Sequence, residues 1–221
     1  NKLTNKCDVL IAVGMRFDDR VTGDLSRYAR QAKVIHLEID PAEIDKNVKT
    51  DVAILGNAKE SLSALTELIN ENEHKDWLAK FRDLEKEEFN KVINEELNPK
   101  SELMTMGEVM NKINLHSDQK NIIVTDVGQH QMVACRYAKF KKTRSLITSG
   151  GLGTMGFCLP AAIGAKMGRP DAQVIGIIGD GGFQMTIQEL GTIFQFKTAV
   201  KIVVLNNEFL GMVRQWQELF F

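Results

Sequence analysis

The sequence predicts an α/β protein in which parallel β-sheets and helices form three-layer domains. Short runs rich in Val and Ile alternate with stretches whose apolar residues recur at helical spacing. Several of these runs end abruptly in Gly, Asp or Asn, at the point where open parallel sheets bind ligands. A densely charged stretch at residues 71–98 interrupts the alternation, so we expect two domains, at 1–75 and 101–221, with a helical linker at 76–100.

The first half contains three predicted strands. They are residues 7–13 (CDVLIAV), 33–39 (KVIHLEI) and 52–55 (VAIL), which end at Gly14, Asp40-Pro41 and Gly56. Residues 25–33 (LSRYARQAK) are predicted to form a crossover helix between the first two strands. Residues 58–72 (AKESLSALTELINEN) repeat apolar positions at helical spacing and predict another helix. This strand–helix–strand order indicates parallel pairing.

The charged stretch, residues 71–98, predicts an amphipathic helix followed by a linker that ends near Pro99. Its charges are of both signs, and four apolar side chains fall roughly on one face: Trp77, Phe81, Leu84 and Val92. We interpret the charged side as a solvated face, and a helix that binds a partner is the alternative.

The second half resumes the alternation at Ser101. Thr105 and Glu108 have the spacing of a capping box and predict the start of a helix over 105–116. Pro160 suits the first turn of a helix over 159–168, and a further helix is expected over 187–196. Strands are expected at 121–126 (NIIVTD), 144–149 (RSLITS), 173–180 (QVIGIIGD) and 200–207 (VKIVVLNN). Three of these strands run into predicted loops, which are DVGQHQ, GDGGF and LNNEF.

Composition excludes several classes of function. The net charge of −1 gives no electrostatic case for binding nucleic acid or an anionic membrane. The apolar runs are too short to span a bilayer. The three cysteines, Cys7, Cys135 and Cys158, lack metal-ligand spacing and predict free thiols in a cytoplasmic protein.

Two polar motifs follow neighbouring predicted strands. Gly179-Asp180-Gly181 ends the first strand, and Asn206-Asn207 ends the second after 24 intervening residues. A carboxylate and an amide oxygen at one edge of a sheet suit Mg²⁺, which often completes its shell with phosphate oxygens. The glycines allow backbone N–H groups to approach phosphate, and the N-terminus of the following helix favours an anion. Either motif alone is explained as well by a tight turn or a strand exit, but together they indicate a metal–diphosphate site.

The same spacing matches the thiamine diphosphate-binding motif of thiamine-dependent enzymes. Within that superfamily the chain resembles the catalytic large subunits of acetolactate synthase (acetohydroxyacid synthase). The strings that carry the resemblance are RFDDRVTG (16–23), VGQHQM (127–132), TSGGLGTMGFCLPAAIGA (148–165) and LNNEFLGMVRQW (205–216). The resemblance covers nearly the whole chain. It implies the later part of a central FAD-binding Rossmann-like domain at 1–75 and the first part of a thiamine diphosphate-binding domain at 101–221.

The resemblance also implies residue roles. Asp180 and Asn207 would bind Mg²⁺ through their side chains and Phe209 through its carbonyl group. The implied contacts of thiamine diphosphate are Gln129, His130, Gly153, Thr154, Met155, Gly181 and Gly182. Met212 and Trp216 would border the substrate channel with Arg20 near its mouth, and Arg20 and Trp216 would select the acceptor substrate. The implied contacts of FAD, which would be structural, are Gly14, Arg16, Asp18, Glu38, Ile39 and Asn57.

The activity that the resemblance implies is a transferase reaction. Pyruvate would lose carbon dioxide, and the hydroxyethyl group would pass to pyruvate or 2-ketobutyrate, which is the first common step of branched-chain amino acid biosynthesis. The family acts as a homodimer or larger homo-oligomer with its active site at the subunit interface, and a regulatory small subunit is a possible partner. A glutamate that the reaction needs would come from the pyrimidine-binding domain of the partner subunit. The chain has no start methionine and stops within an amphipathic pattern, so we expect an internal piece that is inactive alone.

Three residues depart from the family pattern. Gly182 stands where Ser is common, which removes a hydroxyl contact to the diphosphate. Asn57 stands where Asp is usual, which puts one FAD contact in doubt. Cys158 stands where Gly or Ala is usual and is expected to change only packing.

Alternative readings remain open. The loop 151–156 (GLGTMG) fits a dinucleotide fingerprint, but the strand before it is short. His36, His74 and His116 are interpreted as structural or exposed. Met155, Met212 and Trp216 could be core or helix-face residues. The rival functions are a thiamine diphosphate-dependent decarboxylase or oxidase, a cofactor-binding module without catalysis, and an FAD-dependent oxidoreductase.

Overall fold

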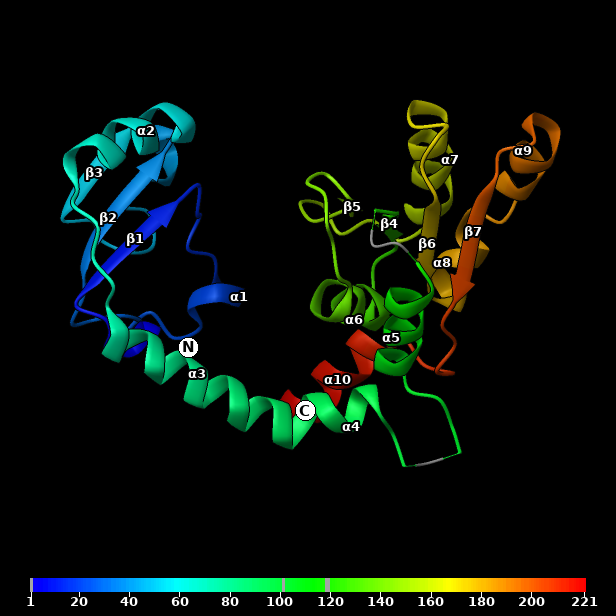
Figure 1. The fold of residues 1–221 in the computed structure, drawn as a ribbon, viewed down its shortest axis with the longest axis horizontal. Coiled ribbons are helices and arrows are strands. Elements are labelled where there is room, and N and C mark those ends of the chain that lie inside the picture. Colours follow the sequence, from blue (N-terminus) through cyan, green and yellow to red (C-terminus); the bar gives the residue numbers. More distant parts are fainter. Residues whose placement is uncertain (1, 101, 118–119) are drawn as a thin grey trace. The chain divides into compact units, whose positions relative to one another are not determined.

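A computed structural model describes residues 2–100, 102–117 and 120–221, and it divides into two units, Asn1–Glu87 and Glu88–Phe221 (Figure 1). The division falls inside the segment expected to be a linker. Asn1 and Ser101, the expected first residues of the two domains, lie outside the described residues. Within the described residues, no helix is both long and apolar enough to cross a membrane.

The first unit contains a parallel three-stranded sheet in the order β1-β2-β3. Its strands are β1 (Val9–Val13), β2 (Lys33–Glu38) and β3 (Val52–Leu55), as the sequence predicts. Short helical elements surround them: η1 (Thr4–Lys6), α1 (Asp19–Thr22), η2 (Pro41–Glu43) and the longer α2 (Ala58–Leu68). The core gathers Ala12 of β1 and Val34 of β2 with Phe17, Tyr28 and Ala29 from the connection between these strands.

The crossover helix predicted over 25–33 is wrong. The described chain forms turns between α1 and β2. Ala29 has a φ of 45°, a left-handed conformation that no right-handed helix accommodates. Its N–H donates to Asn5 Oδ1 at 2.8 Å, and Asp24 Oδ1 accepts both the N–H and the hydroxyl of Ser26. Side chains thus take the backbone bonds that a helix would have used.

Residues 75–97 are helical, as expected, with one irregularity. α3 (Lys75–Glu88) belongs to the first unit except for its last residue, and the π-helical turn η3 (Phe89–Ile93) and α4 (Asn94–Leu97) belong to the second. No side chain of these three elements is buried. In α3 the rings of Trp77 and Phe81 meet edge to face at 5.6 Å.

The second unit contains a parallel four-stranded sheet in the order β5-β4-β6-β7 (Figure 1). The strands are β4 (Ile122–Thr125), β5 (Leu146–Ile147), β6 (Val174–Ile178) and β7 (Val200–Val204). The helices are α5 (Met106–His116), α6 (Gln129–Tyr137), α7 (Cys158–Gly168), α8 (Asp180–Met185), α9 (Glu189–Phe196) and α10 (Gly211–Phe220).

Helices cover both faces of this sheet. On one face, Cys158, Leu159 and Ala162 of α7 pack with Val124 and Val174. On the other, Met110 of α5 and Ala134 of α6 belong to a second cluster with Ile123, Ile175 and Ile177 of the strands. Neighbouring strand residues thus point to opposite helical layers, which gives the three layers that the sequence predicts.

The helix signals in this unit were confirmed in part. Thr105 Oγ1 accepts the N–H of Glu108 at 3.0 Å and caps α5, and Pro160 lies in the first turn of α7. The expected loops DVGQHQ and GDGGF are wrong in part, because α6 begins at Gln129 and α8 begins at Asp180.

Candidate functional site

A pocket of about 220 Å³ lies at the carboxyl edge of the second sheet, where β4, β6 and β7 end. The predicted site residues that line it are Gln129, His130, Gly153, Met155, Asp180, Gly181, Gly182, Asn207, Phe209 and Met212. The structure therefore brings together side chains from the segments after three strands. Gly179 of the first polar motif also lines the pocket, as do Gly128 and Leu210, to which the sequence analysis gave no role.

The spacing of the two polar motifs is explained by strand pairing. β6 and β7 are hydrogen-bonded neighbours, with Ile178 opposite Val204. Asp180 follows β6 and Asn207 follows β7, so both line the same pocket. Parallel strands that are adjacent in the sheet present their carboxyl ends side by side, as the motif reading requires.

Asn207 is held by hydrogen bonds on both sides of its amide. Its Nδ2 donates to Gln129 Oε1 at 2.9 Å, and its Oδ1 accepts the N–H of Phe209 at 3.3 Å. Gly211 stands where any Cβ would overlap Gln129 Oε1. The amide is thereby oriented, and Oδ1, which accepts one long bond among the described residues, keeps capacity for a further partner.

The side chain of His130 lies close to the backbone of two glycines. Its side chain is buried at 6% exposure, and a Cβ on Gly128 or Gly179 would lie 2.6 Å or 2.9 Å from its Cε1 atom. Burial lowers the pKa of the imidazole, although the charges of Asp126 and Asp180 act in the opposite direction. Its Nε2 atom has no hydrogen-bond partner within the part of the chain that the structure describes. A buried ring nitrogen without a partner is costly, and a ligand in the adjoining pocket is one way to satisfy it.

Asp126, at the end of β4, is the main residue that the sequence analysis did not assign to the site. Its carboxylate is fully buried. Oδ1 accepts the N–H groups of Val127 and Gly156 at 2.9 and 3.0 Å, and Oδ2 accepts that of Cys158 at 2.9 Å. Three charge-assisted bonds thus fix the loop that carries Met155 against the end of the strand.

Gly182 is required by this carboxylate. A Cβ at position 182 would overlap Asp126 Oδ1, whereas a Cβ on Gly181 would make ordinary contacts, 3.5 Å from Met155 Cε and 3.6 Å from Leu210 Cδ2. The serine that the resemblance leads one to expect at 182 therefore does not fit beside Asp126 as it stands. Cys158, the third departure, is completely buried, and burial, with the Asp126 charge, raises the pKa of its thiol to about 12.

Two predicted residues of the second unit do not line the pocket. Thr154 is exposed, and its N–H donates to Ser149 Oγ at 3.0 Å. Trp216 is half-exposed on α10, with its ring 4.7 Å from that of Phe220. Met212, one turn earlier on the same helix, does line the pocket.

The remaining predicted residues lie in the first unit, after its strands. Gly14 follows β1, Glu38 ends β2, Ile39 is exposed just beyond it, and Asn57 follows β3. Glu38 Oε1 accepts the N–H of Ile39 at 2.8 Å. Asn57 caps α2 by accepting the N–H of Lys59 at 2.9 Å, a bond that the more usual Asp could equally make.

The other three predicted residues, Arg16, Asp18 and Arg20, lie in the segment after β1. Asp18 caps α1 by accepting the N–H of Val21 at 3.3 Å and pairs with Arg16 at 3.4 Å. Arg20 lies on α1 with its side chain exposed. These bonds give Asp18 a local structural role whether or not a ligand is present.

The described residues contain no group of three or more His, Cys, Asp or Glu side chains arranged to hold a metal ion. The predicted magnesium set is not a group of this kind, because it consists of one carboxylate, one amide and one backbone carbonyl.

Comparison with known proteins identifies the class of the chain. Residues 126–221 match the family described as "Thiamine pyrophosphate enzyme, C-terminal TPP binding domain", and residues 1–65 match "Thiamine pyrophosphate enzyme, central domain". The chain therefore belongs to the thiamine pyrophosphate enzymes; thiamine pyrophosphate is another name for thiamine diphosphate.

Within this class, the chain is similar to acetolactate synthase large subunits. It is 48% identical to the probable large subunit of Methanocaldococcus jannaschii over 100% of the chain and 38% of that protein. It is 45% identical to the large subunit of Lactococcus lactis over 98% of the chain and 37% of that protein. The isozyme 2 large subunit of Escherichia coli is 42% identical over 100% of the chain and 39% of that protein. The chain thus spans less than half the length of these relatives.

Proposed function

We propose that this chain forms part of an acetolactate synthase large subunit and holds its thiamine diphosphate. The observation that carries the proposal is the convergence of Asp180, Asn207, Gln129 and His130 on one pocket at the carboxyl edge of the sheet. The similarity to acetolactate synthase large subunits along the whole chain supports it.

The pocket residues fit a magnesium–diphosphate group. Asp180 and Asn207 Oδ1 offer the hard oxygen ligands that Mg²⁺ prefers, with the carbonyl of Phe209 as a third. The unpartnered Nε2 of His130 and the N–H groups of Gly181 and Gly182 in the first turn of α8 suit phosphate oxygens. Gln129, which orients Asn207, would keep the metal ligand in place.

The remaining predicted contacts would shape the site around the cofactor. Gly153, Thr154 and Met155 belong to the loop that Asp126 fixes, and Met155 would support the cofactor from beside Gly181. When bound, thiamine diphosphate supplies the electron sink for loss of carbon dioxide from pyruvate and for transfer of the hydroxyethyl group. The chain's own contribution is to orient the cofactor and exclude water from the apolar side of the pocket.

Met212 and Trp216 are proposed to border the substrate channel, and Trp216 and Arg20 to select the acceptor. Met212 lines the pocket, and Trp216 lies one helical turn further along α10. The guanidinium of Arg20 suits the carboxylate of a 2-keto acid. The acceptors would be pyruvate, which gives 2-acetolactate, and 2-ketobutyrate, which gives 2-aceto-2-hydroxybutyrate, in the biosynthesis of branched-chain amino acids.

The first unit is proposed to bind FAD at the carboxyl ends of its strands, with Gly14, Arg16, Asp18, Glu38, Ile39 and Asn57 as contacts. The glycine turn after β1 and the acidic residue that ends β2 support this placement. A homodimer with the active site at its interface and a regulatory small subunit belong to the same proposal. A cytoplasmic location is supported by three cysteines that form no disulfide.

The test uses the complete protein that carries this chain, supplied with pyruvate, thiamine diphosphate, Mg²⁺ and FAD. Mass spectrometry should detect acetolactate, and added 2-ketobutyrate should divert the product to acetohydroxybutyrate. Acetaldehyde or acetate instead would assign the protein to a decarboxylase or oxidase. Bound cofactor without release of carbon dioxide would leave a binding module without catalysis.

A further inference from the structure

A second pocket lies at the opposite, amino edge of the same sheet. It has a volume of about 430 Å³ and is lined by Lys120, Ile122, Lys142, Thr143, Arg144, Ser145, Arg169 and Ala172. The volume is in the range of small-molecule sites. The proposed function makes no use of this pocket.

The floor of the pocket is built from the beginnings of three strands. Ile122, Ser145 and Ala172 are all buried, and they stand at the start of β4, before β5 and before β6. The N–H of Ile123 donates to the carbonyl of Ser145 at 2.8 Å, and that of Ile122 to the carbonyl of Gln173 at 2.9 Å. The floor is therefore fixed by the sheet itself.

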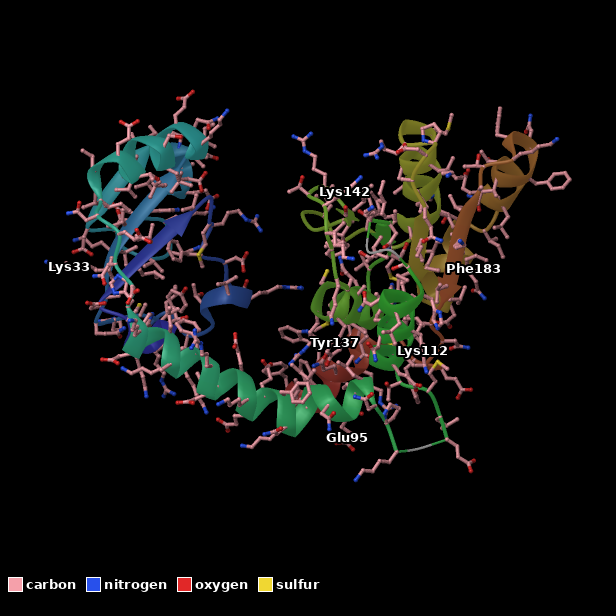
Figure 2. All side chains as sticks on the ribbon, viewed as in Figure 1. Lys33, Glu95, Lys112, Tyr137, Lys142 and Phe183 are labelled. Atoms are coloured by element: carbon pink, nitrogen blue, oxygen red, sulfur yellow. The ribbon has the colours of Figure 1, made fainter. Side chains whose placement is uncertain are left out.

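The rim of the pocket is cationic. Its four ionisable lining residues, Lys120, Lys142, Arg144 and Arg169, are all basic and come from three separate segments, whereas the whole chain has a net charge of −1. Figure 2 shows Lys142 on the loop that precedes β5. Like charges gathered around one concavity favour the entry of an anion.

One carboxylate beside the rim is already engaged. Arg169 binds Asp171 through two parallel bonds, Nε to Oδ1 and Nη2 to Oδ2, both at 3.1 Å. These bonds, with a smaller contribution from the charge of Lys142, lower the pKa of Asp171. Asp171 thus offsets part of the charge of Arg169, while Lys142 and Arg144 keep charges that an anion in the pocket can meet.

We propose that this pocket binds a small molecule carrying a diphosphate or triphosphate group. Arginine and lysine side chains with hydroxyl neighbours, here Thr143 and Ser145, are typical phosphate-binding groups. The concave shape favours a compact anion over an extended acidic peptide, which would need a longer groove.

The test titrates inorganic pyrophosphate into the complete protein, already saturated with thiamine diphosphate, Mg²⁺ and FAD, by isothermal titration calorimetry. We expect submillimolar binding. Lys142→Ala and Arg144→Gln should each weaken it about tenfold, as expected for loss of a charge-assisted bond. Lys141→Ala is the matched control, because it removes the same charge from the same loop at a residue that does not line the pocket.

A change of opposite sign sharpens the test. Asp171→Asn removes the competing carboxylate from Arg169 and should tighten pyrophosphate binding severalfold. Pyrophosphate binding to Asp180→Asn that Lys142→Ala still weakens about tenfold places the probe at the amino edge of the sheet, whatever the outcome for the proposed function. The proposal is overturned if pyrophosphate does not bind or if Lys141→Ala weakens its binding as much as Lys142→Ala. It is also overturned if poly-glutamate, titrated as an extended acidic peptide, is the only anion that binds.

Discussion

The two sheets are built from similar apolar runs but are buried to different extents. In the first unit, Val9, Ile11 and Val13 of β1 leave about half of their surface exposed, and Ile11 is 50% exposed. In the second, every residue of β4 and β6 is buried, and Ile177 is 0% exposed. The difference in burial follows from how much of each sheet is covered by helices. Helices lie on both faces of the second sheet, whereas the exposed side chains of β1 share one face of the first.

The comparison shows that a Val/Ile run can form either a partly exposed strand or a fully buried one. A run indicates a strand, but only packing partners decide whether its side chains form a core. The second sheet, whose strands β4 and β6 are fully buried, also carries the pocket with most of the proposed cofactor residues. Rigid strand ends on a packed core are suited to hold a ligand precisely.

The largest expected effect concerns ligand binding, because each unit is proposed to bind a different ligand. Asp180→Asn removes the only carboxylate of the proposed magnesium set, so the affinity for thiamine diphosphate with Mg²⁺ should fall on the order of 100-fold. The flavin content of the complete protein should not change. Glu38→Gln is the converse variant and should lower flavin content while thiamine diphosphate binding, followed by calorimetry, stays as it was. Equal losses of both ligands in either variant would contradict the division.

The second prediction tests the difference in burial. Ile177→Ala should lower the free energy of unfolding of the second unit by about 3–4 kcal/mol, because it opens a cavity in a closed core. Ile11→Ala should lower that of the first unit by about 1 kcal/mol or less. The two tryptophans, Trp77 and Trp216, lie in different units, so urea unfolding of Trp216→Phe and Trp77→Phe backgrounds reports each unit separately. Similar losses for both isoleucine variants would refute the comparison.

The third prediction concerns the contact between Gly182 and Asp126. Gly182→Ala should lower the stability of the second unit by about 2 kcal/mol through overpacking. Gly181→Ala, with room for its Cβ, is the matched control and should cost clearly less. In an Asp126→Ala background the cost of Gly182→Ala should shrink, which a double-mutant cycle in urea measures. Additive effects would mean that the carboxylate is not what excludes a side chain at 182.

The smallest effect is a pH dependence confined to the second unit. Burial lowers the pKa of His130, so the unfolded chain binds its proton more readily than the folded chain. The unit should therefore lose stability as the pH falls from 7 through about 6.5, by at most about 1.4 kcal/mol per pH unit. His130→Asn should remove this part of the slope, whereas the exposed His116→Asn should not. Thermal unfolding at several pH values tests this, and identical slopes in both variants would contradict it.

The strands could be predicted because each is a local β-branched run bounded by turn residues. Three of the seven, β4, β6 and β7, end within three residues of polar or glycine positions that line the pocket. The site could be predicted to the extent that its residues stand directly after strands, as Asp180 and Asn207 do. Their roles as ligands stay predictions.

What could not be predicted depends on distant partners. Residues 25–33 have helical periodicity, but Asn5, 24 residues away from Ala29, accepts the backbone N–H that a helix would use. α6 and α8 begin with GQHQ and GDGG, which carry neither a capping side chain nor an apolar stripe. In the sequence Asp126 is simply the residue that ends a strand. The N–H groups that donate to its carboxylate belong to Gly156 and Cys158, which stand 30 and 32 residues further on.

The bond between Gln129 and Asn207 joins residues 78 positions apart, and this has a consequence for synthesis in the cell. At about 5–20 residues per second, Asn207 is translated roughly 4–16 s after Gln129. During that interval the segment that forms β4 and α6 is without β7 and without the amide of Asn207. Any structure that it forms in that time rests on its own contacts, and the proposed ligand can engage Asn207 only after β7 has left the ribosome.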